Sequence, residues 1–164
     1  MPSSPRAFTA HDHDDCSADV LARAEALDRD GRLRLTPVRR RTLEILAEAH
    51  RALGAYEVLD RLKAEGFGNQ PPVAYRALDF LVEHGLAHRI RRLNAFAACT
   101  QPDSAHAPAF LICEACGSVA ELPGAATARA LRDEARQAGF DLARMSIEAV
   151  GTCPACKGAA DGPD

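Results

Sequence analysis

Two Cys-x-x-Cys pairs are the residues of this sequence whose type and spacing point most directly to chemistry. The first pair is Cys113 and Cys116, the second is Cys153 and Cys156, and residues 117–152 lie between them. Two intervening residues let both thiolates of a pair reach one metal ion, and four thiolates complete the tetrahedral shell of structural zinc. The spacing therefore predicts a structural zinc site. Two local disulfides, or one redox-active pair, are the alternatives.

The stretch between the pairs is longer than the roughly 15–20 residues of a compact zinc ribbon, so it must contain secondary structure of its own. The expected elements are strands at residues 109–113, 118–122 and 142–150 and a helix at residues 125–138. We therefore expect a small α/β domain at residues 107–157 whose two ends the metal joins. A polar tail at residues 158–164 is expected to be disordered.

The composition is that of a globular chain that stays inside the cell. Of its 164 residues, 47% are hydrophobic and 26% are charged, as in ordinary globular domains. No apolar run approaches the roughly 20 residues of a membrane span, and the N-terminal segment lacks the apolar core of a secretory signal. We expect a cytoplasmic protein with no membrane partner, whose six cysteines stay reduced and available for metal.

The net charge of −3 hides an uneven distribution of charge along the chain. Residues 32–92 carry 12 basic and 7 acidic residues, whereas residues 1–31 and residues 93–164 each have a net charge of −4. A basic middle between acidic flanks indicates a local surface for a polyanion such as nucleic acid. Ordinary surface arginines are the alternative explanation.

Four helices are expected in the N-terminal half. Helical periodicity together with start and stop signals places them at residues 17–30, 37–49, 55–65 and 73–84. Thr36 and Pro37 give the strongest signal, a hydroxyl N-cap followed by proline at the first helical position. Residues 1–16 form a polar tail, expected to be disordered, whose His11, His13 and Cys16 could hold metal only weakly.

A basic hairpin follows the fourth helix. Residues 87–92 and 95–99 have strand composition on either side of a tight turn. Helices followed by such a hairpin make a winged helix-turn-helix, in which one helix enters the major groove of DNA and the wing touches the backbone. We therefore predict an α+β protein with a winged helix at residues 17–98, a hinge at residues 99–106, and the α/β domain beyond it.

The chain contains four motifs that have counterparts in one family. They are RLTPVRR at residues 34–40, PPVAYRALDFLVEHGLAH at 71–88, FLICEACGSVAEL at 110–122 and CPAC at 153–156. Together they resemble the ferric-uptake-regulator family of dimeric, metal-dependent repressors, and most closely its zinc-uptake branch. The family usually has Thr-Val before Tyr-Arg, whereas this chain has Val73-Ala74. That difference puts a phosphate or capping contact of the threonine in doubt.

The resemblance implies DNA contacts from the fourth helix and from the arginines around it. Tyr75 and Arg76 lie in the N-terminal half of that helix, the part that faces base edges in helix-turn-helix proteins. Arginine can donate two hydrogen bonds to guanine, and tyrosine can contact phosphate or a thymine methyl group. The residues expected to contact phosphates without reading sequence are Arg39, Arg40, Arg89, Arg91 and Arg92. For each of these arginines a plain surface role is the alternative.

The resemblance also implies a second, regulatory zinc site. Its ligands would be His88, Cys99, His106 and Glu121, which match the zinc-uptake branch residue by residue. The first two begin and end the wing, His106 lies in the hinge, and Glu121 follows the first Cys pair. One thiolate, two imidazoles and one carboxylate suit tetrahedral zinc. The total is then two zinc ions per chain.

The same comparison bears on which metal is sensed. Iron-sensing and peroxide-sensing relatives have a His-rich segment before the first Cys pair and a further His near the last strand. This chain keeps only His106 in the first region and has Met145 in the second. A Cys thiolate in place of oxygen and nitrogen ligands favours zinc over iron.

The sequence therefore predicts a homodimeric, zinc-responsive repressor of zinc-uptake genes that binds operator DNA, dimerises through its α/β domain and is not an enzyme. It contains no Ser/His/Asp nucleophile arrangement and no phosphate-binding glycine loop. One alternative is a member of the same family that senses iron or peroxide. The alternative from another class is a thiol-disulfide oxidoreductase, which needs an exposed cysteine of low pKa at a helix N-terminus.

Overall fold

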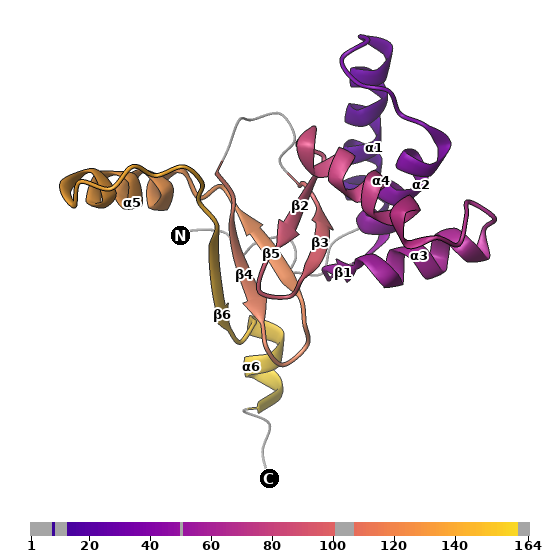
Figure 1. Cartoon of the computed structure of the whole chain (residues 1–164). Helices are drawn as coiled ribbons and strands as arrows, with labels where there is room; N and C mark the ends of the chain where they lie inside the picture. Colours follow the sequence, from indigo (N-terminus) through magenta and orange to yellow (C-terminus); the bar gives the residue numbers. More distant parts are fainter. Residues whose placement is uncertain (1–7, 9–12, 50, 101–106, 161–164) are drawn as a thin grey trace. The chain divides into compact units, whose positions relative to one another are not determined.

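The computed structural model describes residue 8 and residues 13–49, 51–100 and 107–160. The chain divides into two compact units, His11–Pro102 and Asp103–Asp164 with Met1–Ala10. Within the described residues each unit contains a three-stranded sheet of its own together with helices (Figure 1). The predicted α+β class is confirmed.

The N-terminal unit is a winged helix-turn-helix. Its helices are α1 (His13–Arg29), α2 (Pro37–Glu48), α3 (Ala55–Ala64) and α4 (Pro71–Glu83), and its strands are β1 (Leu53–Gly54), β2 (Ala87–Ile90) and β3 (Ala95–Ala98). The strand order is β1-β3-β2, with antiparallel pairing throughout. Helices α3 and α4 form the helix-turn-helix, and the β2–β3 hairpin is the wing.

Helix α2 begins where the sequence predicts. The hydroxyl of Thr36 accepts a hydrogen bond from the backbone N–H of Arg39 at 3.4 Å, and Pro37 occupies the first helical position. One face of α2 is buried, including Leu43 and Ile45. This capping fixes where the helix starts and hence which residues face the core.

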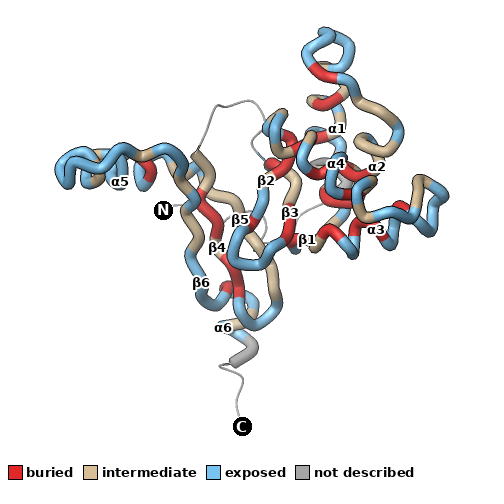
Figure 2. Tube along the Cα trace, in the orientation of Figure 1, coloured by how far each residue is buried: buried red, intermediate tan, exposed pale blue. Residues whose placement is uncertain are grey.

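One apolar core joins the helices to the wing. Leu43 of α2, Leu62 of α3, Leu78 of α4 and Phe96 of β3 belong to a single cluster, and each is at most 2% exposed. Figure 2 shows the buried residues of this unit along the facing sides of its helices. Because Leu78 and Phe96 share the core, α4 is held in a fixed relation to the wing.

The C-terminal unit is a sheet with two helices. Its elements are β4 (Ala109–Cys113), β5 (Val119–Leu122), α5 (Ala125–Gln137), β6 (Ile147–Gly151) and α6 (Pro154–Ala160). The strand order is β5-β4-β6, with β4 antiparallel to β5 and parallel to β6. Helix α5 projects away from the sheet (Figure 1). None of the described helices combines the length and apolarity that crossing a bilayer requires.

The first helix and the last strand differ from the sequence prediction. Helix α1 begins at His13 rather than at residue 17, so residues 13–16 of the predicted disordered tail are helical. Acidic residues that directly follow His13 in the sequence are typical of the first turn of a helix. Strand β6 begins at Ile147 rather than at residue 142, because its partner β4 begins at Ala109, directly opposite.

Two short elements were not predicted. Strand β1 has two residues, too few for an alternating pattern, and exists through its pairing with β3. Helix α6 reaches Ala160, so residues 158–160 of the predicted disordered tail are helical. Pro154 at the first helical position and alanines at the end favour this short helix. Residues 161–164 lie outside the described part of the chain.

Arg41 ties α2 to the end of α3. Its guanidinium donates to both carboxylate oxygens of Glu65, at 2.6 and 2.9 Å, and to Glu44 at 3.1 Å and Glu48 at 2.8 Å. Hydrogen bonds to Glu65 and Glu48 raise the pKa of Arg41, and Arg41 lowers the pKa of Glu65. One guanidinium therefore holds together three carboxylates that would otherwise repel each other.

We predict that Arg41→Ala lowers the melting temperature at neutral pH by roughly 5 °C more than Arg51→Ala. Among the described residues, Arg51 forms an ion pair with Glu57 on an exposed surface, where a single ion pair contributes little. The pKa of Glu65 is lowered in the folded state. Its contribution to the stability of the folded protein is therefore fully present above pH 4.5, the ordinary carboxyl pKa, and is lost as the pH falls through the lowered pKa.

Thermal melts over a pH series measure both effects. The difference in melting temperature between Arg41→Ala and the wild type should become smaller below pH 4.5, the ordinary carboxyl pKa. Equal losses for the two variants at neutral pH would contradict the network.

Candidate functional site

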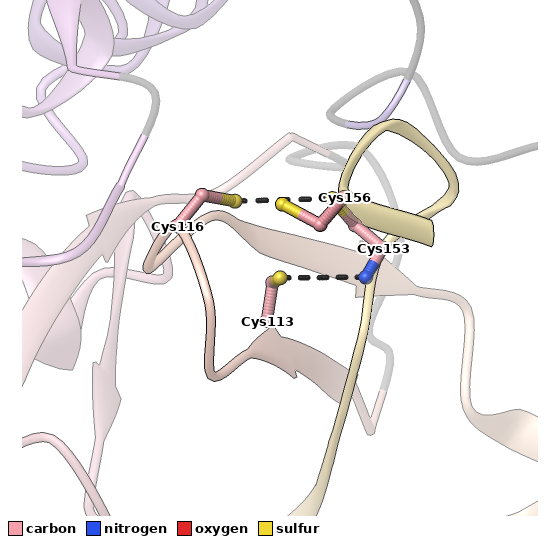
Figure 3. A group of neighbouring side chains, drawn as sticks. All are labelled: Cys113, Cys116, Cys153 and Cys156. Atoms are coloured by element: carbon pink, nitrogen blue, oxygen red, sulfur yellow. Dashed lines mark hydrogen bonds between the residues drawn. The ribbon is translucent and has the colours of Figure 1, made fainter. Parts of the chain in front are cut away.

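The C-terminal ends of β4 and β6 bring both Cys pairs to one edge of the sheet. Cys113 ends β4 and Cys153 follows β6, and the four sulfurs of Cys113, Cys116, Cys153 and Cys156 lie within 4.8 Å of one another (Figure 3). Tetrahedral zinc with Zn–S bonds of about 2.3 Å needs sulfurs about 3.8 Å apart. Cys116 Sγ and Cys153 Sγ are 3.8 Å apart. The four residues therefore fit a structural zinc ion.

Tight backbone turns present both pairs. The chain turns after Cys113 through Gly117, whose N–H donates to the Cys113 carbonyl at 2.9 Å and whose φ of +74° is readily adopted only by glycine. In the second pair, the N–H of Lys157 donates to the Cys153 carbonyl at 3.0 Å as α6 begins. The backbone N–H of Cys153 also donates to Cys113 Sγ at 3.3 Å, which links the two pairs directly.

Hydrogen bonds prepare this cluster for a cation. The backbone N–H of Cys153, with others in the first turn, lowers the pKa of the Cys113 thiol to about 6. The hydroxyl of Ser118, with Oγ 3.1 Å from Cys116 Sγ, lowers the pKa of Cys116. The neighbouring sulfurs, Cys153 first, raise the pKa of Cys156 to about 12. Further thiolates are therefore unfavourable beside the first unless a divalent cation neutralises them.

The same geometry bears on a redox role for the pairs. Cys153 stands directly before α6, the position of a redox-active cysteine at a helix N-terminus, but it is only 5% exposed. The cysteine with a pKa of about 6 is Cys113, which ends a strand and is 2% exposed. Cys116 is exposed and Ser118 lowers its pKa, but it lies in the turn between β4 and β5 and not at a helix N-terminus, where the redox alternative expects the reactive cysteine.

His88 and Cys99 lie on the same face of the wing. His88 is opposite Ala97 in the β2–β3 register, and the N–H of Cys99 donates to the carbonyl of Leu86 at 2.9 Å, which continues that register. The imidazole and the thiol are diagonal neighbours, with ligand atoms within 4.8 Å. Cys99 is buried and His88 is half-buried. One thiolate and one imidazole at this separation can share a metal ion.

The other two predicted regulatory ligands are not part of this pair. Glu121 is half-buried on β5 of the C-terminal unit, opposite Phe110. His106 lies outside the described residues. Only His88 and Cys99 of the predicted set are thus placed together within one unit, and the full set of four ligands stays a prediction.

Helix α4 presents Tyr75 and Arg76 to solvent. Its buried residues are Ala74, Ala77, Leu78 and Leu81. The helical period leaves Tyr75, which is 39% exposed, and the exposed Arg76 on the other side, in the N-terminal half of the helix. Both side chains are therefore exposed, and their contacts with base edges stay a prediction.

Val73 replaces the usual threonine with a packing contact. Its Cγ2 lies 3.3 Å from where a Cβ would stand on Gly68, a glycine with φ of +124°. The branched side chain therefore packs against the turn that enters α4. Position 73 therefore makes an apolar packing contact and offers no hydroxyl.

The predicted phosphate-binding arginines of α2 already have partners within the protein. Arg40 forms ion pairs with Glu25 of α1 and with Glu44, the latter at 3.1 Å. The guanidinium of Arg39 lies over the ring of Phe80 in α4, 3.6 Å from its centroid. Both would have to exchange these contacts for contacts with DNA.

The arginines of the wing are placed differently. Arg89 donates from Nη2 to Oδ1 of Asn94 at 2.9 Å, across the hairpin. Asn94 has a φ of +47°, a conformation that asparagine tolerates in turns. Arg91 and Arg92 are exposed in this turn, so the wing presents positive charge at its tip.

Tyr56 is an exposed aromatic residue that the sequence analysis did not single out. It lies in the first turn of α3 and is 63% exposed. The available signal was its position off the stripe of Ala55, Val58 and Leu59, which are buried. An aromatic side chain on the polar face of a helix-turn-helix is a further candidate for contact with nucleic acid.

Comparisons with known proteins match most of the chain. The model of the ferric uptake regulator family matches residues 30–150. The zinc uptake regulation protein of Escherichia coli K12 is 36% identical over 139 residues, 84% of this chain and 81% of that protein. A protein of the same description from Shigella flexneri matches equally well.

Solved structures of similar fold include two relatives above 30% identity. A zinc uptake regulator complexed with zinc and DNA is 34% identical, with a TM-score of 0.83 over 89% of this chain and 98% of that one. Holo XcZur is 38% identical, with a TM-score of 0.77 over 87% of this chain and 99% of that one.

We predict that Cys116→Ser removes the metal from the four-cysteine cluster, whereas Ser118→Ala keeps it. The matched control deletes the hydroxyl beside Cys116 Sγ but leaves four sulfur ligands. Zinc content by elemental mass spectrometry should fall by one ion per chain in Cys116→Ser only. The same variant should lose the thermal transition of the C-terminal unit, because structural zinc binding is coupled to folding. A stable Cys116→Ser protein with unchanged zinc content would refute the site.

Proposed function

Because the chain belongs to the ferric uptake regulator family, we propose that it is a zinc-responsive, DNA-binding transcriptional repressor of zinc-uptake genes. The observation that carries the proposal is the close similarity, over both units, to a regulator complexed with zinc and DNA. It acts in the cytoplasm and regulates transcription without catalysing a reaction. Its partners are operator DNA and a second copy of itself.

Helix α4 enters the major groove in this proposal. Arg76 reads a guanine and Tyr75 contacts a thymine methyl group or a phosphate, since both are exposed in the N-terminal half of the helix. Arg89, Arg91 and Arg92 place the wing against phosphates. Tyr56, exposed at the start of α3, adds a contact from the other helix of the motif.

The exposed apolar surface of the C-terminal unit supports a homodimer. Ala128 is the one buried residue of the 13-residue helix α5, and an isolated helix of that length is marginally stable in water. Leu131 of α5, Phe140 and Val150 of β6 are 40%, 63% and 41% exposed. A second copy of the unit would cover these side chains and stabilise α5. The resulting two-fold symmetry matches an operator with two half-sites.

Two zinc ions per chain have separate roles. The four cysteines hold the structural ion, which supports the dimerisation unit. The regulatory ion is held by His88, Cys99, His106 and Glu121. This assignment is supported by the ligand atoms of His88 and Cys99, which lie within 4.8 Å of each other on the wing. The thiolate of Cys99 makes this set more suitable for zinc than for iron.

Regulation follows from linkage between zinc and DNA. The proposed ligands of the second ion come from the wing, the hinge and β5, so zinc binding would restrict how the DNA-binding unit moves against the dimerisation unit. In the metal-free protein this motion would have to be restricted at the moment of DNA binding, at a cost in conformational entropy. Zinc and operator therefore increase each other's affinity by the same factor.

Arg76→Ala should weaken operator binding by about 1–3 kcal/mol and relax sequence preference, because the bidentate contact to a base is lost. Arg91→Ala should weaken binding to all duplexes about equally and reduce the salt dependence, because one phosphate contact is lost. Fluorescence anisotropy with operator and scrambled duplexes at several salt concentrations separates the two. If Arg76→Ala weakened binding to all duplexes about equally, as expected for Arg91→Ala, the assignment of α4 as the helix that reads bases would be wrong.

Cys99→Ser should stay folded and dimeric, keep about one zinc per chain, and lose zinc-dependent operator binding. The structural zinc is spared because its four thiolates lie in the other unit. Ala98→Ser is the matched control, since Ala98 lies on the opposite face of the strand. Zinc content, gel filtration and zinc titration of operator affinity are measured on one preparation. Retained zinc response would contradict the regulatory site, and loss of the dimer would make Cys99 a structural residue.

A further inference from the structure

Arg39 and Phe80 join the start of α2 to the middle of α4. The guanidinium carbon of Arg39 lies 3.6 Å from the ring centroid of Phe80, a distance at which the planar cation stacks on the aromatic face. Phe80 follows Arg76 by one helical turn, so both lie on neighbouring positions of one helix surface. The contact therefore acts on the part of α4 next to the proposed base-reading residue.

The conformation of Arg39 is fixed independently of DNA. Its Nη1 donates to the carbonyl of Arg34 at 2.7 Å, and its backbone N–H donates to the Thr36 hydroxyl at 3.4 Å. The residue is half-buried. The guanidinium is therefore held at its edge by a carbonyl and on one face by a ring.

Phe80 extends the contact to the end of α4. Its ring centroid is 4.1 Å from that of His84, with the two planes inclined at 33°. His84 is the C-cap of α4, and its Nδ1 lies 2.8 Å from the Phe80 carbonyl oxygen. Arg39, Phe80 and His84 thus form a continuous stack along the second half of the helix, here called the Arg39 stack.

We propose that Arg39 is a positioning residue that orients α4 through Phe80, and not a phosphate contact. The inference rests on the proposed function, since it takes α4 as the helix that reads DNA. A guanidinium that turned to a phosphate would give up both the ring and the Arg34 carbonyl. Bidentate recognition of a base depends on the angle at which Arg76 arrives, and the Arg39 stack fixes that angle from one turn away.

The two roles predict different behaviour for Arg39→Lys. Lysine keeps the charge but lacks the planar face and the fork of N–H donors, so it replaces arginine poorly in a stack and adequately at a single phosphate. We expect both Arg39→Lys and Arg39→Ala to lose about tenfold in operator affinity, the scale of a partly desolvated cation–π contact. Affinity for a scrambled duplex should be unchanged in both variants.

The dependence of affinity on salt gives a second readout. Loss of one phosphate contact lowers the slope of log affinity against log salt concentration by about 0.9. For a positioning residue the slope stays at the wild-type value in both Arg39→Lys and Arg39→Ala. Arg51→Lys is the matched control, because Arg51 is an exposed arginine of the same unit that lies outside the proposed DNA contacts and has no aromatic partner among the described residues; the operator affinity of this variant should be that of the wild type.

Phe80→Leu tests the same stack from the other side. Leucine keeps apolar bulk at a half-buried position but removes the aromatic face, so operator affinity should fall about as far as in Arg39→Lys. Adding Arg39→Lys to Phe80→Leu should cause no further loss, because the two residues act as one unit. Circular dichroism, zinc content and gel filtration confirm that each variant is folded, loaded and dimeric before DNA is added.

The outcomes separate this inference from the proposed function. An Arg39→Lys protein with wild-type affinity, together with a slope reduced by about 0.9 in Arg39→Ala, would make Arg39 a phosphate contact and overturn the inference. Phe80→Leu with wild-type operator affinity would also overturn it. Failure of the wild type to bind any duplex in response to zinc would instead refute the proposed function, and the coupling of Arg39 with Phe80 in thermal stability would still be measurable without DNA.

Discussion

The parallel pairing of β4 with β6 is the constraint on which the C-terminal unit depends. It sets Cys113 opposite Gly151, so two Cys pairs far apart in sequence arrive at one edge of the sheet. A parallel pair needs a crossover connection, which explains the long interval and places β5 and α5 between the pairs. Hydrogen bonds from Cys153 and Ser118 then favour negative charge on sulfur before any ion binds. In this unit the metal would hold together an arrangement that the backbone already forms.

The arginines of the N-terminal unit are of two kinds, those that form ion pairs within the protein and those that are exposed. Arg40 and Arg41 are engaged with glutamates of α1, α2 and α3, so part of the basic excess of residues 32–92 stabilises helix packing. The arginines of the α4 face and the wing tip are exposed. A sequence count of positive charge therefore overestimates the surface available to DNA. It also misses that Arg39 contacts an aromatic ring of the recognition helix.

The proposed division of labour places sensing at the end of the wing and assembly at the Cys pairs. His88 and Cys99 are neighbours because the β2–β3 register continues through Cys99, and Cys99 is also where the chain leaves the DNA-binding unit. A metal ligand at Cys99 can therefore couple metal binding to the orientation of the DNA-binding unit. In this proposal the four-cysteine cluster would remain loaded while the regulatory site fills and empties.

The sequence by itself determined the elements with strong local signals. Thr36-Pro37 fixed the start of α2, and the residues flanking α4 fixed its approximate extent. Cys-x-x-Cys spacing predicted the four cysteines that the structure brings together, because all three depend on neighbouring residues. Only tertiary structure decided what depends on distant partners: β1 exists through β3, β6 begins where β4 allows it, and His88 meets Cys99 through strand register. The partners of Arg39 and Arg40 were likewise invisible, since Phe80 and Glu25 become neighbours only when α4 and α1 pack on α2.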